Sequence, residues 1–236
     1  MNARARKIGR REAIGAMGAA ATAALAIGCG AGNSATPTGP STTPPTTGGT
    51  TNSECSVTPS ETAGPYPSTV DLFRSDIRED RQGTPLALAV RVVNTNGACA
   101  AVPNANVEIW HCDVSGNYSE YGTQTTRNYL RGIQTTDANG TVTFTTIYPG
   151  WYQGRATHIH AEVTIGGRTV KTTQIAFPES INNTVHASGV YASRGSNPTS
   201  NASDGIFADS LSAELVTPAG SPSGGYSATF QIAIAV

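Results

Sequence analysis

Apolar residues recur at every second position in several runs between Leu86 and Val236, which is the spacing of a β-strand with one buried face. The clearest runs cover residues 86–92, 105–112, 142–144, 159–165 and 226–236. Turn-forming pairs separate them, at Asn96-Gly97, Asn139-Gly140, Gly166-Gly167 and Gly224-Gly225. No segment carries a sustained helical stripe. Short strands joined by such turns predict an all-β fold, a β-sandwich of two sheets with long loops.

Residues 178–223 interrupt this alternation and are rich in Asn, Ser, Gly and Ala. This composition predicts a long surface excursion, with a short helix near residues 206–215.

The first 28 residues have the pattern of an export signal peptide. Five basic residues between Arg4 and Arg11 precede an apolar, alanine-rich run from Ala13 to Ile27, which is too short for a membrane span. Arg10-Arg11 resembles a twin-arginine signal, the export route of proteins that fold before transport. An ordinary secretory signal with incidental arginines is the alternative.

Leu25–Cys29 resembles a bacterial lipobox, so we expect Cys29 to be lipidated and to become the mature N-terminus. Ala26 stands where leucine is usual, and simple cleavage of the signal is the alternative. Residues 29–53 are dominated by Pro, Thr, Gly and Ser and predict a disordered linker. We therefore expect an exported domain over residues 54–236, at the cell surface, in the periplasm or secreted, that contacts the membrane only through a lipid on Cys29.

Removal of residues 1–28 makes the chain acidic. The signal takes five of the 15 basic and one of the 16 acidic residues, which leaves ten against fifteen and a net charge of −5. This balance argues against nucleic acid as a partner.

Three cysteines remain for the folded domain: Cys55, Cys99 and Cys112. An oxidising compartment permits one disulfide and leaves one thiol over. The predicted strand 105–112 spans about 25 Å and separates Cys99 from Cys112, unless the connecting loop folds back. The spacing therefore favours a Cys55–Cys99 disulfide.

His158 and His160 offer the clearest chemical signal. Because they stand two positions apart on a predicted strand, both imidazoles project from one face and can serve as a pair of metal ligands. A surface pair would have the same spacing. Tyr152 and Arg155 lie within the same short stretch, and phenolate is an oxygen ligand suited to a ferric ion.

Several motifs occur in a fixed order around these histidines: Thr58–Tyr66, Val107–Asp113, Gly116–Ser119, Thr136–Gly140, Pro149–Tyr152, Arg155–His160 and Thr173–Phe177. With these motifs the sequence resembles the intradiol ring-cleavage dioxygenases. Enzymes of that family are non-haem iron(III) proteins that use O2 to open catechol-type rings between the two hydroxyl groups. The resemblance runs from about Cys55 to Phe177.

The resemblance implies an Fe(3+) cofactor bound by Tyr118, Tyr152, His158 and His160. Two phenolates and a hydroxide balance the three positive charges of the ion, which favours the ferric over the ferrous state.

The resemblance also implies roles around the metal. Tyr152 corresponds to the ligand that leaves when substrate chelates the iron and then accepts a catechol proton. Arg155 corresponds to the arginine that stabilises negative charge on the ring. Gln174, together with Pro65 and Tyr66 of the first motif, corresponds to residues of the substrate pocket.

Other polar residues have simpler explanations. His111 shares a face with Val107 and Ile109, so we expect it to pack or hydrogen-bond near the site rather than bind metal. Glu162 lies on the histidine face and could complete a ferrous site of two histidines and one carboxylate, although we expect it to be solvated or paired. His186 lies in the polar excursion, and we expect no role for it.

The expected activity is cleavage of a catechol-type substrate with O2 to a muconate-type diacid. A non-enzymatic surface lipoprotein, whose β-sandwich binds a ligand or partner, is the alternative from another class. A cupin-type ferrous enzyme would need a further downstream histidine motif, which the sequence lacks. The sequence does not distinguish catechol, protocatechuate and hydroxyquinol as substrates, and it leaves the oligomeric state open.

Overall fold

The structure is a computed structural model that describes residues 55–236. The expected signal peptide, the lipid site at Cys29 and the linker 29–53 lie outside these residues.

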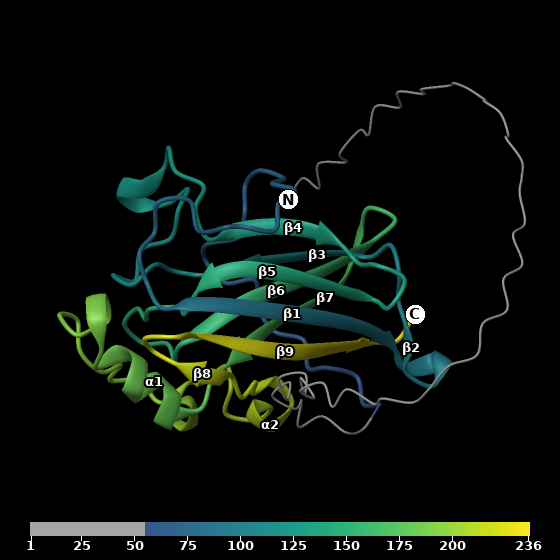
Figure 1. Cartoon of the computed structure of the whole chain (residues 1–236). Helices are drawn as coiled ribbons and strands as arrows, with labels where there is room; N and C mark the ends of the chain where they lie inside the picture. Colours follow the sequence, from purple (N-terminus) through teal and green to yellow (C-terminus); the bar gives the residue numbers. More distant parts are fainter. Residues whose placement is uncertain (1–54) are drawn as a thin grey trace, which may run out of the picture. The chain divides into compact units, whose positions relative to one another are not determined.

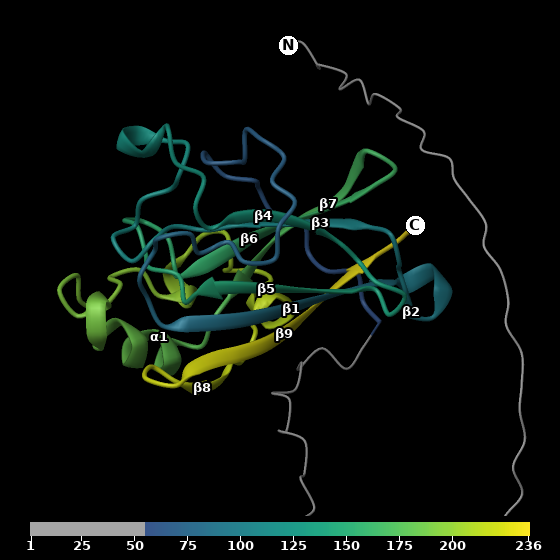
Figure 2. The ribbon, with the colours of Figure 1, turned by 45° about the horizontal axis from the view of Figure 1, so that its top comes forward.

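Two β-sheets lie face to face in the described part of the chain (Figures 1 and 2). The first sheet contains β1 (Pro85–Asn94), β2 (Ala100–Ala101), β5 (Thr141–Ile147), β8 (Ala219–Ser221) and β9 (Gly225–Ile234). The second contains β3 (Asn106–Trp110), β4 (Arg131–Thr135), β6 (His158–Ile165) and β7 (Arg168–Ala176). This arrangement confirms the predicted all-β sandwich.

The first sheet is organised around β1. This strand pairs in parallel with β9 over nine residue pairs, from Leu86–Tyr226 to Asn94–Ile234. On its other side it pairs antiparallel with β5 and, at its end, with β2. β8 pairs antiparallel with β9 and closes the other edge.

The second sheet is antiparallel throughout, in the order β4-β3-β6-β7. Its register places four residues in one row across the strands: Arg131, Trp110, His160 and Gln174. Side chains alternate between the faces of a strand, so this row shares one face.

The hydrophobic core fills the space between the sheets. Its buried residues alternate along the strands, for example Leu86, Leu88 and Val90 on β1 and Ile159, Ala161 and Val163 on β6. Since Ile159 and Ala161 face this core, His158 and His160 project from the outer face of the second sheet.

The strand ends differ slightly from the prediction. β3 ends at Trp110 rather than at Cys112, and β9 ends at Ile234, which leaves Val236 outside the strand and half exposed. β4 and β7 were not predicted. On β7, Lys171 and Thr173 occupy positions facing the same side as Ile175, where apolar residues would be expected. Polar groups of the N-terminal segment and of the region before β8 satisfy them, which removes the usual alternation.

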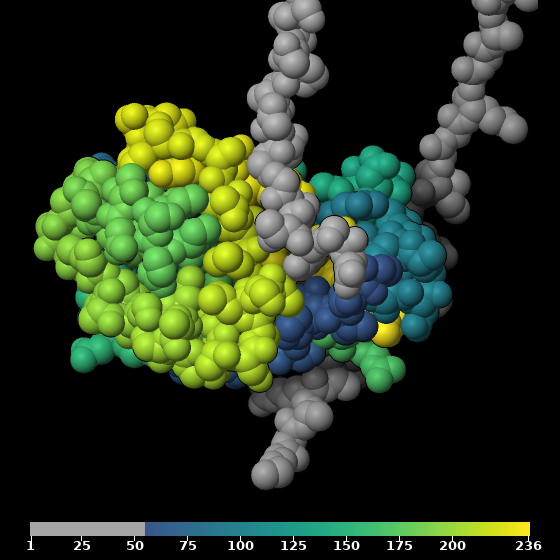
Figure 3. Space-filling model, turned by 90° about the horizontal axis from the view of Figure 1, so that it is seen from below, coloured from purple at the N-terminus to yellow at the C-terminus, as the bar shows by residue number. Residues whose placement is uncertain are grey.

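The segment 178–223 lies at the surface (Figure 3), and the short helix predicted near residues 206–215 is confirmed as α2 (Leu211–Glu214), but the segment is not the loose excursion that was expected, because part of it packs into the domain. The segment also contains α1 (Glu179–His186), and it buries ten side chains: Asn182, Val185, His186, Tyr191, Asn201, Asp204, Phe207, Glu214, Val216 and Pro218. Figure 3 shows this segment, green to yellow-green, as one continuous part of the surface beside the N-terminal part of the domain in blue.

Small polar side chains explain why this segment packs without an apolar pattern. Asn182 and Asn201 both donate hydrogen bonds to the carbonyl oxygen of Phe177, and the Asn182 amide oxygen accepts from the Tyr148 hydroxyl. His186, for which no role was expected, is buried on α1 near the carbonyl oxygen of Pro149. No helix among the described residues is long and apolar enough to cross a membrane.

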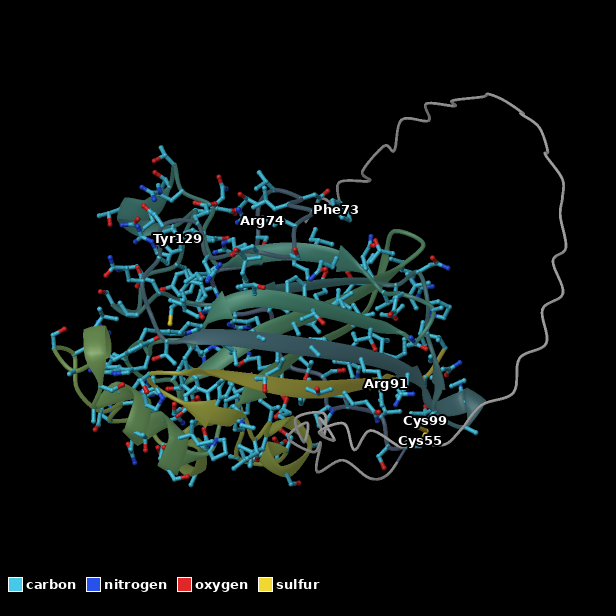
Figure 4. The ribbon with its side chains drawn as sticks, viewed as in Figure 1. Cys55, Phe73, Arg74, Arg91, Cys99 and Tyr129 are labelled. Atoms are coloured by element: carbon cyan, nitrogen blue, oxygen red, sulfur yellow. A yellow bond between two sulfur atoms is a disulfide. The ribbon has the colours of Figure 1, made fainter. Side chains whose placement is uncertain are left out.

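The Cys55–Cys99 disulfide is present, with a Cα–Cα distance of 5.6 Å. Figure 4 shows the two cysteines together where β1 ends, so the bond fastens the start of the described chain to the first sheet. Cys112 is a free, buried thiol, as the cysteine count required.

Candidate active site

The candidate site lies on the outer face of the second sheet, where His158 and His160 begin β6. His160 is fully buried and its ring stacks on the Trp110 indole, with the ring centroids 4.9 Å apart and the planes nearly parallel. The strand fixes the backbone of both histidines and the indole fixes one ring. The two imidazoles are therefore held in place before any ligand binds.

Tyr118 and Tyr152 reach the histidines from two loops. Their ring centroids lie 5.6 Å apart, and Tyr118 is buried whereas Tyr152 is partly exposed. The loops approach closely at Gly116, which has φ +81 and on which a Cβ would overlap the carbonyl oxygen of Trp151. Glycine is needed there because it tolerates both this backbone conformation and the close contact.

Arg131 on β4 supports the Tyr118 loop from the sheet. Its guanidinium is buried and donates to the Ser119 hydroxyl at 2.9 Å, to the Ser119 carbonyl at 2.7 Å and to the Tyr66 carbonyl at 2.9 Å. A planar fork with several donors can bind all three acceptors at once. Arg131 therefore fastens the loop that carries Tyr118 to the segment that carries Tyr66.

The predicted ligand atoms converge. The Nε2 atoms of His158 and His160 are 3.1 Å apart, and the Tyr118 hydroxyl oxygen is 3.5 Å from Nε2 of His158. Nδ1 of His158 lies 2.6 Å from the carbonyl oxygen of Ala156, which can only accept, so Nδ1 carries the proton. Nε2 of His158 is then left with a free lone pair that faces His160.

Burial keeps these groups uncharged when no cation is present. Desolvation, reinforced by the nearby Arg155, lowers the pKa of His158 to about 3, and burial lowers the pKa of His160 far below its usual value. Burial also raises the pKa of Tyr118 and of Tyr152. Neutral imidazoles bind metal directly, whereas the two phenols need a strong positive charge nearby to ionise.

Arg155 is held beside Tyr152 on the same turn, where its N–H donates to the Tyr152 carbonyl oxygen at 3.3 Å. Its Nη1 lies 3.5 Å from the Tyr152 hydroxyl, and its Nη2 donates to the Gln174 amide oxygen at 2.5 Å. Its Nε donates to both carboxylate oxygens of Asp204, at 2.9 and 3.2 Å. The Arg155 guanidinium is therefore held by three side chains, those of Asp204, Gln174 and Tyr152.

The predicted substrate residues have distinct places. Tyr66 stacks on Tyr118, with centroids 4.6 Å apart, and meets Tyr152 edge to face. Pro65, just before it, is exposed. Gln174 is fully buried and uses both ends of its amide on the protein, because it accepts from Arg155 and donates to the Thr62 carbonyl at 2.9 Å.

The remaining polar candidates lie outside the convergence point. His111 is buried and hydrogen-bonds through its two ring nitrogens to the Cys112 carbonyl and the Thr146 hydroxyl, as expected for a packed histidine. Glu162 accepts from Thr169 and Thr172, farther along β6. Within residues 55–236 no group of three or more His, Cys, Asp and Glu side chains could hold a metal, so a metal here needs the tyrosines.

The residues present fit a ferric ion. Two nitrogen ligands at right angles on one metal, each about 2.1 Å from it, are about 3 Å apart, which agrees with the 3.1 Å between the two Nε2 atoms. Two phenols that ionise only beside a cation complete a donor set that suits a trivalent metal. The ion would be held by Tyr118, Tyr152, His158 and His160.

Sequence reasoning missed several residues that shape the site. Asp204 binds Arg155 across 49 positions of sequence, Phe207 lies beside the His158 ring, and Trp110 supports His160. A buried arginine calls for a carboxylate partner. The segment 178–223 contains four carboxylates, Glu179, Asp204, Asp209 and Glu214, and the sequence alone does not distinguish them.

Comparison with known proteins finds similarity to dioxygenases. The model of a family described as "Dioxygenase" matches residues 60–196. A catechol 1,2-dioxygenase of Acinetobacter baylyi is 33% identical over 130 residues, which are 46% of this chain and 41% of that protein. The chain thus matches about two fifths of the length of this curated relative.

Solved structures extend the similarity over the domain. An intradiol ring-cleavage dioxygenase from Tetranychus urticae is 33% identical, with a TM-score of 0.71 over 77% of this chain and 95% of the other. The dioxygenase domain of a carbohydrate-binding fusion protein from Streptomyces sp. SirexAA-E is 29% identical, with a TM-score of 0.59 over 77% and 99%. The chain belongs to the intradiol ring-cleavage dioxygenase family.

Proposed function

We propose that this protein is a non-haem iron(III) dioxygenase that cleaves catechol-type substrates with O2 to muconate-type diacids. The observation that carries the proposal is the convergence of two histidine nitrogens, 3.1 Å apart, with a tyrosine oxygen 3.5 Å from one of them, beside a second tyrosine held next to a fixed arginine. A catechol could chelate ferric iron bound there through both of its oxygens, and the ion would draw electron density from the ring.

The chain's own groups account for the proton and charge steps around that chemistry. Burial raises the pKa of Tyr152, so its phenolate, if not bound to a metal, would be a strong base that could take a catechol proton. Arg155 lies 3.5 Å from the same oxygen and supplies a fixed positive charge for the chelated, anionic ring. Tyr66 and the buried Tyr118 form the aromatic wall beside it.

We further propose that the enzyme acts outside the cytoplasm on catechols released there. The basic and apolar pattern of residues 1–28, the lipobox at Cys29 and the linker 29–53 support this location. Catechol, protocatechuate and hydroxyquinol are the substrates to compare.

The test is iron content, visible colour and oxygen uptake. Two phenolates on one ferric ion should give a visible tyrosinate-to-iron charge-transfer band, and Tyr118→Phe and Tyr152→Phe should each change it. Addition of catechol should consume one O2 for each ring opened. A colourless protein with stoichiometric iron would rule out this ligand set, and iron without oxygen uptake would favour the non-enzymatic binding protein.

A further inference from the structure

Asp204 stands out because it is a fully buried carboxylate whose two oxygens both accept several bonds. Oδ2 accepts from Arg155 Nε at 2.9 Å and from the Ala156 backbone N–H at 2.6 Å. Oδ1 accepts from Arg155 Nε at 3.2 Å and from the Ile206 backbone N–H at 2.8 Å. It is 1% exposed, so these partners replace water entirely.

The arrangement decides where the Arg155 guanidinium can point. Nε is committed to Asp204, and Nη2 to the amide oxygen of Gln174, which is itself anchored on the Thr62 carbonyl. The Nη1 edge is the one left toward the Tyr152 hydroxyl. A guanidinium is planar, so fixing two of its corners fixes the third.

We propose that Asp204 is the positioning residue for Arg155, and that the segment 201–207 is thereby part of the catalytic site of this chain. The inference rests on the proposed function, because it assigns how the charge that acts on the bound ring is aimed. Asp204 does not touch the substrate and acts through Arg155. A mobile arginine would still supply charge but would spread it over several rotamers, and a correctly aimed charge is worth far more than a diffuse one.

A carboxylate is required at this position rather than any polar group. Each oxygen accepts from a backbone N–H, Ala156 on one side and Ile206 on the other. An asparagine would have to place its NH2 group against one of these donors in either orientation. The Asp204→Asn variant therefore removes the negative charge at position 204 and one of the two oxygen acceptors. The Arg155 guanidinium is then no longer held in one orientation.

The test is a double-mutant cycle on kcat with catechol, using Asp204→Asn, Arg155→Ala and the double variant. We expect Asp204→Asn to lower kcat about 10- to 100-fold, with bound iron and the KM for catechol changed much less. In the Arg155→Ala background the same substitution should have no further effect on kcat, because the residue through which it acts is gone. Losses in kcat that multiply in the double variant would overturn the proposal, as would wild-type kcat in Asp204→Asn.

Two further measurements separate positioning from a structural role. Anaerobic binding of catechol, followed by the change in the visible band, should be weakened less than 10-fold by Asp204→Asn. Loss of iron from this variant would mean that Asp204 holds the His158 segment rather than Arg155, and would overturn the proposal. Asp137→Asn is the matched control, because the exposed Asp137 accepts two backbone N–H bonds in a turn between β4 and β5. It should leave kcat unchanged.

If Asp204→Asn does not fold, Arg155→Lys tests the same geometry from the other side. Lysine keeps the charge but lacks the fork that binds Asp204 and Gln174 together. A turnover rate at least tenfold below that of the wild type, with iron retained, supports the proposal, and wild-type turnover overturns it. A wild-type protein that binds no iron and consumes no O2 would instead refute the proposed function itself.

Discussion

At the scale of single residues, the site combines groups that are each unfavourable when buried alone. Two neutral histidines and two phenols lie in a water-poor environment, and a guanidinium lies beside them. A cation at the convergence point would relieve the phenols by ionising them, whereas Arg155 is balanced separately by Asp204. The positive charge of a bound cation and the positive charge of Arg155 are therefore balanced by different groups, so each can be removed without the other.

Arg155→Ala should separate metal binding from ring cleavage. We expect the variant to keep its iron and its colour, since Arg155 is not among the proposed ligands, and to lose about 100-fold or more in kcat. Asp204 would stay buried without its cation, so the free energy of unfolding should also fall, by roughly 3 kcal/mol. Wild-type turnover by a variant that has lost stability would remove Arg155 from the mechanism.

At the scale of elements, the alternating strands could be predicted and the segments that complete the site could not. The patterns of Leu86 to Val92 and of Ile159 to Ile165 predicted β1 and β6, and the spacing of the two histidines predicted their common face. The edge strand β7 was hidden because Lys171 and Thr173 face partners that are distant in sequence. Periodicity detects burial against apolar surface, and it does not detect burial against polar groups.

The segment 178–223 was misjudged for the same reason. Half of its ten buried side chains are polar and hydrogen-bonded, so composition alone resembled that of a solvated loop. Because the packing of this segment was missed, Asp204 was missed as well, although its partner Arg155 was predicted as a site residue. Contacts of this kind are properties of the fold rather than of a local motif.

Glu214 at the end of α2 should make the stability of this element depend on pH. Burial, with Glu61 and Asp209 nearby, raises the pKa of Glu214 to about 7 from an ordinary 4.5. Between these two values the folded state binds more protons than the unfolded state, so the free energy of unfolding falls as pH rises. Glu214→Gln is neutral at every pH and should be more stable than the wild type at pH 8, by on the order of 3 kcal/mol.

The measurement is urea unfolding of the wild-type and Glu214→Gln proteins at pH 5 and pH 8. Asp137→Asn, which removes a carboxylate from an exposed turn, is the control. The Glu214→Gln and wild-type proteins should have similar stability at pH 5 and should diverge at pH 8. An equal difference at both pH values would show that Glu214 titrates normally in the folded protein.

At the scale of the whole molecule, the Cys55–Cys99 disulfide links the first described residue to a residue 44 positions later in the sequence. It was predicted by excluding Cys112 through the length of one strand, and that argument survives although β3 ends two residues earlier than expected. The double variant Cys55→Ser/Cys99→Ser should lose roughly 2–4 kcal/mol of stability, because the unfolded chain gains the freedom that the bond removes. Equal stability of this variant and the oxidised wild type in urea would mean that the disulfide adds no stability, because the segment around Cys55 is already held by its other contacts with the sheet.

The oxidation state of Cys55 and Cys99 tests the proposed location, because disulfides persist in oxidising compartments and are reduced in the cytosol. We expect the wild-type protein to fractionate with membranes outside the cytoplasm and to resist thiol alkylation at Cys55 and Cys99. Replacing Arg10-Arg11 by Lys-Lys should block twin-arginine export and leave both cysteines reduced and alkylated in the cytoplasm. Cys29→Ser should instead release an oxidised protein from the membrane, since it removes the lipid site and not the export route. A wild-type protein that fractionates with the cytoplasm and carries free Cys55 and Cys99 would refute the proposed location, and with it the proposal that the substrates are extracellular catechols.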